Sequence, residues 1–65
     1  MHITTFSTDD AKMLCQLLID YGVTFSTRGL ANEEWGFEFD LSDRLKDDFM
    51  REIEDMLMEE PIIKV

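Results

Sequence analysis

The sequence predicts a single small α+β domain in which two helices cover one face of an antiparallel sheet. The strongest evidence is the alternation of Trp35, Phe37, Phe39 and Leu41 with small or acidic residues, a period that is typical of a strand with one buried face. Two further segments, residues 11–21 and 45–57, carry apolar side chains at helical spacing. Sixty-five residues suffice for one domain at most, so residues 1–65 are expected to form a single domain.

The N-terminal part of the chain predicts a strand followed by a helix. Ile3 to Phe6 is β-branched and aromatic, which favours a short strand. Ser7 with Asp10 three residues later resembles a capping box and predicts the start of a helix. Gly22 is suited to the left-handed position that ends it. The apolar face of this helix comprises Ala11, Leu14, Cys15, Leu18 and Tyr21.

The middle of the chain predicts a hairpin. Residues 23–27 alternate between apolar and polar types, residues 28–33 have loop composition, and the strand that begins at Trp35 follows. The polar positions of this hairpin predict an open sheet face that faces solvent. They are Thr24, Ser26, Glu38 and Asp40.

The C-terminal part predicts a second helix and a short last strand or ordered tail. Ser42 is a good N-cap, and Asp43 in the first turn suits the helix dipole. The helix is expected to run to about Glu60, because Pro61 cannot continue it. Its inner face comprises Leu45, Phe49, Ile53, Met56 and Leu57. With a last strand at residues 62–65, the order is that of a split βαβ, or ferredoxin-like, domain (βαββαβ). Without that strand the sheet has three strands.

The net negative charge of the chain indicates which kinds of partner it can bind. Fifteen Asp and Glu against six Lys and Arg give a net charge of −9. Nucleic acid and anionic membranes attract positive protein surfaces, so direct binding to either is not expected. A basic protein surface is the expected partner, and a solubilising surface without a partner is the alternative reading.

The acidic residues of the second helix are regularly placed. Asp48, Glu52, Asp55 and Glu59 follow i, i+4, i+7 and i+11, which places them in one stripe, with Asp47 beside it. Met58 and Met13 fall outside the apolar helix faces, and exposed methionine is common at adaptable binding surfaces. The predicted partner-binding residues are therefore Asp48, Glu52, Asp55, Glu59, Asp47, Met58 and Met13. The open sheet face or a strand edge is a further candidate, for self-association as a homodimer.

No catalytic set, metal site or cofactor motif is identified. His2 is the only histidine and lies next to the N-terminus, and Cys15 is the only cysteine and is expected in the core. A weak magnesium or calcium site around Asn32, Glu33 and Glu34 is the remaining metal option. The lone cysteine and the absence of a long apolar segment favour the cytoplasm as location.

Two groups of proteins are loosely similar to this chain. In size and acidity it resembles the small inhibitors that phages and mobile elements deploy against host enzymes, including anti-CRISPR and DNA-mimic proteins. In element order it resembles small ligand-sensing domains of the ACT type. The first resemblance implies a non-catalytic inhibitor that occupies a basic surface of a nucleic-acid-handling protein. The second implies a homodimeric sensor of small molecules, and a weak hydrolase or metal-dependent enzyme is a third reading.

Overall fold

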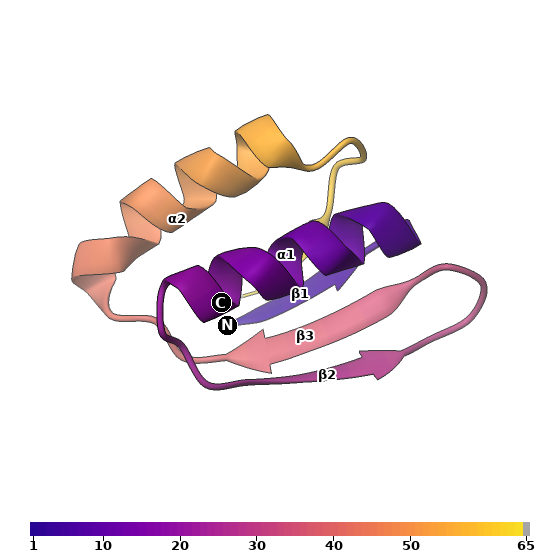
Figure 1. Cartoon of the computed structure of the whole chain (residues 1–65), viewed down its shortest axis with the longest axis horizontal. Coiled ribbons are helices and arrows are strands. Elements are labelled where there is room, and N and C mark those ends of the chain that lie inside the picture. Colours follow the sequence, from indigo (N-terminus) through magenta and orange to yellow (C-terminus); the bar gives the residue numbers. More distant parts are fainter. Residues whose placement is uncertain (65) are drawn as a thin grey trace.

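Two helices lie on one face of a four-stranded antiparallel sheet in the computed structural model, which describes residues 1–64 (Figure 1). The strand order across the sheet is β2-β3-β1-β4, and all three neighbouring pairs are antiparallel. Along the chain the elements are β1 (His2–Thr5), α1 (Thr8–Asp20), β2 (Phe25–Gly29), β3 (Trp35–Phe39), α2 (Asp43–Met56) and β4 (Ile62–Lys64). This order confirms the predicted α+β class and both predicted helices.

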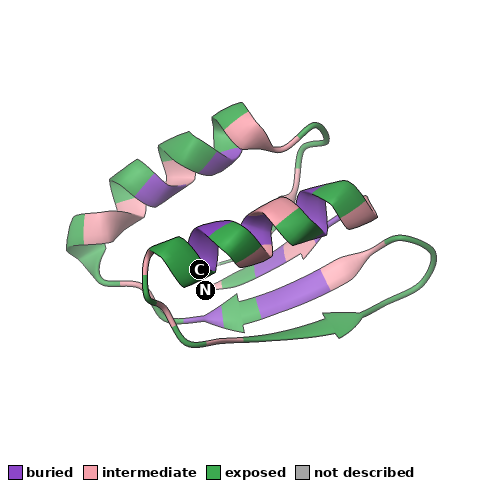
Figure 2. Cartoon of the chain, in the orientation of Figure 1, coloured by how far each residue is buried: buried purple, intermediate pink, exposed green. Residues whose placement is uncertain are grey.

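The core lies between the sheet and the two helices. Ile3 on β1 is paired with Phe37 on β3, and both side chains are buried. Figure 2 shows the buried positions of both helices and of β1 and β3 turned toward this space. The buried apolar residues are Ile3, Ala11, Leu14, Leu17, Leu18, Phe37, Phe39, Phe49 and Ile53. The alternation in β3 therefore predicts its buried face correctly, although Trp35 and Leu41 are only half-buried.

Both predicted ends of α1 are confirmed. The Ser7 side chain accepts a hydrogen bond from the Asp10 amide at 3.1 Å, which satisfies one of the free amides at the start of the helix. Gly22 has φ +70°, the left-handed conformation that glycine adopts at low cost. The amide of Val23 then donates to the Leu18 carbonyl, so the chain turns away from the helix at this point.

The predicted strand limits are displaced in the hairpin. The expected strand at residues 23–27 is instead Phe25–Gly29, because Val23 is still bonded to the end of α1. The expected loop at residues 28–33 is correspondingly shorter, because Leu30 donates to the Glu34 carbonyl at 2.8 Å and closes the hairpin there. β1 also begins and ends one residue earlier than predicted, and β3 ends at Phe39.

The second helix ends earlier than the sequence predicts. α2 stops at Met56, and Leu57 already has an extended backbone, so the expectation that the helix reaches Glu60 was wrong. The amides of Met58 and Glu59 instead donate to the carboxylate of Asp10 on α1, each at 3.0 Å. β4 pairs with β1 over Ile62–Lys64, which confirms a last strand there, while Val65 lies outside the described residues.

Candidate functional site

The acidic residues predicted to bind a partner lie on the outer face of α2 and in the loop that follows it. Asp47, Asp48, Glu52 and Asp55 are all exposed on the helix, and we call these four residues the acidic surface. Glu59 is exposed as well, but it lies three residues beyond the end of α2. The helical stripe therefore has three of its four predicted members, Asp48, Glu52 and Asp55, at an axial spacing of roughly 5–6 Å.

Among residues 1–64, no ion pair forms within the acidic surface, although Arg51 lies one helical turn from Asp47 and from Asp55 on α2. Within residues 1–64 the structure holds one ion pair, between Lys46 Nζ and Asp43 Oδ1 at 3.3 Å, in the first turn of α2. Both of its residues lie before the acidic surface in the chain. The four carboxylates of the acidic surface thus have no cation within salt-bridge distance in the described part of the chain, and they remain available to an external cation.

Tyr21, which the sequence placed only on the inner face of α1, borders the acidic surface. Its ring packs edge-on against Phe49 of α2, with ring centroids 5.5 Å apart. Partial burial raises the pKa of Tyr21, and the carboxylates of Glu52 and Asp48 raise it further. The phenol of Tyr21 therefore lies beside Asp48 and Glu52 of the acidic surface. It can donate a hydrogen bond only while it is protonated.

The raised pKa of Tyr21 can be tested by a spectroscopic titration. Because the chain has a single tyrosine, the tyrosinate absorbance reports this residue alone. We expect Tyr21 to ionise at higher pH in the folded protein than in the urea-unfolded chain. In the unfolded chain its pKa should be near the ordinary value of 10.0. The stability contributed by the neutral phenol is complete below pH 10.0 and is lost as pH rises through the folded pKa.

The control for this titration removes the two neighbouring charges. In the variant Asp48→Asn with Glu52→Gln, the pKa of Tyr21 should move back toward that of the unfolded chain, because the repulsion between the tyrosinate and the two carboxylates is removed. An unchanged titration curve in the folded variant would contradict the placement of Tyr21 beside these carboxylates.

The two methionines predicted to contact a partner lie near one anchor, the buried side chain of Asp10. The amide of Met58 is bonded to Asp10, and the Met58 side chain is 83% exposed. Met13 is half-buried and follows Asp10 by about one turn of α1. The loop after α2 is thus held at the start of α1. The sequence patterns did not predict that Asp10 anchors this loop, because its hydrogen-bond partners are 48 and 49 residues away in the chain.

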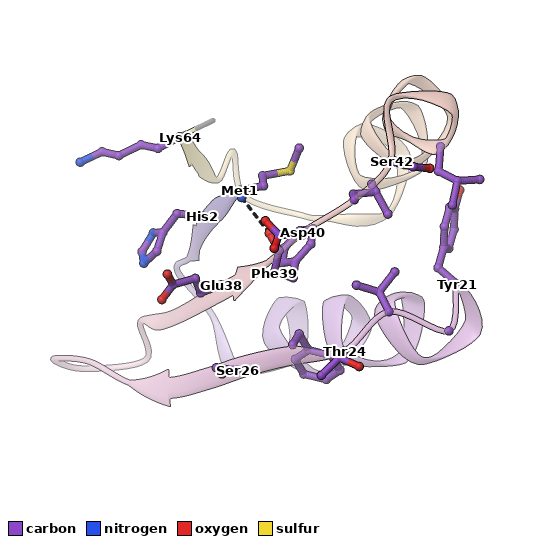
Figure 3. Close-up of a pocket in the computed structure, with 15 residues that line it drawn as sticks. Met1, His2, Tyr21, Thr24, Ser26, Glu38, Phe39, Asp40, Ser42 and Lys64 are labelled. Atoms are coloured by element: carbon purple, nitrogen blue, oxygen red, sulfur yellow. Dashed lines mark hydrogen bonds between the residues drawn. The ribbon is translucent and has the colours of Figure 1, made fainter.

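A hollow of about 760 Å³ opens at the end of the sheet where α1 ends and α2 begins (Figure 3). In Figure 3 the side chains of His2 and Glu38 approach one another from β1 and β3, and Lys64 lies at the same rim. The Met1 nitrogen donates to the Phe39 carbonyl at 2.7 Å across the floor. Thr24 and Asp40, which were expected on the open sheet face, lie outside the strands and line this hollow.

The two residues with candidate catalytic chemistry, His2 and Cys15, lie apart. His2 projects from the open face of the sheet, opposite the buried Ile3, whereas Cys15 lies on α1 on the helix side. Cys15 is half-buried rather than in the centre of the core, and burial raises the pKa of its thiol. Glu33 accepts a hydrogen bond from the Thr8 hydroxyl. Over residues 1–64, no three His, Cys, Asp or Glu side chains are grouped so that they could hold a metal ion.

Within residues 1–64, neither α1 nor α2 is long and apolar enough to cross a membrane. No protein-family model, curated protein or solved structure matches this chain.

Proposed function

We propose that this chain is a non-catalytic binding protein whose acidic surface docks on a basic surface of a nucleic-acid-handling protein and blocks it. The observation that carries the proposal is the row of exposed carboxylates on α2 without a cation within salt-bridge distance. Phosphates on a nucleic-acid strand are also regularly spaced negative charges, so a groove that binds them attracts such a row. We propose that the chain imitates DNA, as inhibitors encoded by phages do. We also propose that it acts in the cytoplasm.

The fold supports this role because the helix that carries the acidic surface is anchored in the core. Phe49 and Ile53 bury the opposite side of α2 in the core, so the carboxylates are held on a fixed scaffold. Preorganised charges bind with a smaller entropic cost than charges on a flexible segment. We propose the ferredoxin-like assignment for the scaffold on its element and strand order. That fold hosts many activities, so the assignment by itself favours no function.

Neutralising the helical stripe tests the proposal. The partner is first isolated from the native host on immobilised protein at low salt, and it is then purified. In the triple variant Asp48→Asn, Glu52→Gln, Asp55→Asn we expect Kd to rise roughly ten- to a hundredfold, because each exposed ion pair contributes about 0.5–1 kcal/mol. Most of the change should appear in the association rate, and wild-type affinity should fall steeply with salt.

The matched control removes the same number of charges elsewhere. Asp9, Asp20 and Glu33 are exposed and lie outside α2, so their conversion to amides gives an equal change in net charge. Glu59→Gln alone reports whether the loop after α2 belongs to the contact. An equal loss of affinity from both triple variants would reduce the effect to net charge, and no loss from the α2 variant would overturn the proposal.

A second candidate function is supported by the hollow at the end of the sheet. Its volume of about 760 Å³ lies within the range of small-ligand pockets, and its rim carries both cationic and anionic side chains. A domain that senses a small polar molecule, as a homodimer of the ACT type, would use such a site. A rise in melting temperature with a set of amino acids and nucleotides would favour this function. The stripe variant should leave that rise unchanged.

A further inference from the structure

The free edge of the sheet at β2 is the part of the surface that the proposed function does not use. β2 is an outer strand and pairs only with β3. Figure 2 shows it exposed along nearly its whole length, and Figure 1 shows α2 on the far side of α1 from it. Edge strands present unpaired backbone groups, and many proteins block them with lysine, proline or a short length. β4, the opposite edge, is only three residues long and carries Lys64, whereas β2 has five residues and Arg28 as its one charge.

The hydrogen-bond pattern identifies which groups on β2 are free. Leu30 and Glu34 form a hydrogen-bonded pair at the hairpin end. Such pairs alternate with non-bonded pairs along antiparallel strands, so Arg28 and Ser26 are the next positions bonded to β3. The backbone N–H and C=O groups of the intervening positions therefore point away from the sheet. These positions are Phe25, Thr27 and Gly29.

An apolar groove runs beside this edge, between α1 and the two strands β2 and β3. It encloses about 310 Å³. Ile19 on its α1 side is 60% exposed, and Cys15 and Trp35 also line it. Lys12 is the only charged residue among its lining side chains, although the chain as a whole has fifteen acidic residues. Among the described residues no carboxylate lines this groove, which favours the approach of a second copy of a protein with net charge −9.

From these observations we infer that the chain forms a two-fold symmetric dimer in which β2 pairs antiparallel with β2 of a second copy. The pairing is centred on Thr27, where the two copies exchange both backbone hydrogen bonds, and Phe25 then faces Gly29 of the second copy. Gly29 has no side chain to obstruct the Phe25 ring of the second copy. Within one chain, the Trp35 ring lies 3.7 Å from the position that a Cβ atom of residue 29 would occupy. The eight-stranded sheet places the two apolar grooves side by side and leaves both acidic surfaces free at its ends.

The dimer is tested by measuring mass against concentration in analytical ultracentrifugation. We expect the mass of two chains for the wild type, and the mass of one chain for Thr27→Pro at the same concentration. Proline removes the outward amide at the centre of the pairing, but it leaves the β2–β3 ladder intact. Thr27→Val is the matched control, because it loses the hydroxyl bond to the Gly36 carbonyl and keeps the amide. This control should remain dimeric.

A second pair of variants tests the groove without altering the strand. Ile19→Lys places a charge in the groove and should weaken the dimer, whereas Met58→Lys changes an exposed apolar residue in the loop after α2, outside the groove lining, and should not. Higher salt should strengthen the dimer by screening two acidic chains, the opposite of its effect on the basic partner. A wild type that has the mass of one chain at all concentrations would overturn the inference. So would a folded Thr27→Pro or Ile19→Lys variant that dimerises like the wild type.

Discussion

Replacing Phe39 by alanine should lower the free energy of unfolding by about 3–5 kcal/mol. Phe39 is buried on β3, and its ring packs against Phe49 of α2 with centroids 5.4 Å apart. Phe49 in turn contacts Tyr21, so the three rings join the sheet to both helices. Removing the first ring leaves a cavity between the layers, and a domain of this size has little stability to lose.

Urea denaturation followed by circular dichroism measures this loss. Phe25→Ala is the matched control, because Phe25 is paired with Phe39 in the register but is only half-buried at the sheet edge. Its loss should be clearly smaller. Phe39→Leu, which retains most of the buried volume, gives a measurable value in case the alanine variant does not fold. Cooperative unfolding of Phe39→Ala near the wild-type midpoint would show that this face of β3 is not the core.

Replacing Asp10 by asparagine should lower the free energy of unfolding by about 2–4 kcal/mol, although the change keeps the shape of the side chain. The Asp10 carboxylate is fully buried, and its two oxygens accept the amides of Met58 and Glu59. Hydrogen bonds to a charged acceptor are stronger than neutral ones. Asparagine offers one acceptor oxygen, so its NH₂ group would face the second amide, which then lacks a partner.

Asp9→Asn is the control for this substitution. Asp9 occupies the same first turn of α1 and has the same relation to the helix dipole, but it is exposed. Its loss should be limited to the dipole contribution of about 0.3–1 kcal/mol. Amide hydrogen exchange gives a second, local measurement, because the amides of Met58 and Glu59 should lose protection in Asp10→Asn alone. Equal stability of the two variants would mean that Asp10 does not hold the loop after α2.

The patterns that the sequence predicted correctly all depend on neighbours in the chain. The alternation around Phe37 identified the buried face of β3, and Ser7 and Gly22 marked the two ends of α1. Strand period, helix capping and the left-handed conformation of glycine are set within a few residues. The positions of the acidic surface on α2 followed from the helical repeat for the same reason.

The tertiary structure decided the features that depend on distant partners. α2 ends at Met56 because the amides beyond it are bonded to Asp10, whose position beside them no local pattern indicates. For the same reason Glu59 leaves the stripe to which the helical repeat assigned it. The free edge at β2 and the groove beside Ile19 likewise follow from the strand order and from where α1 lies over the sheet. Local periodicity selects the face that a residue presents, but only the packing of the whole chain determines whether that face is covered.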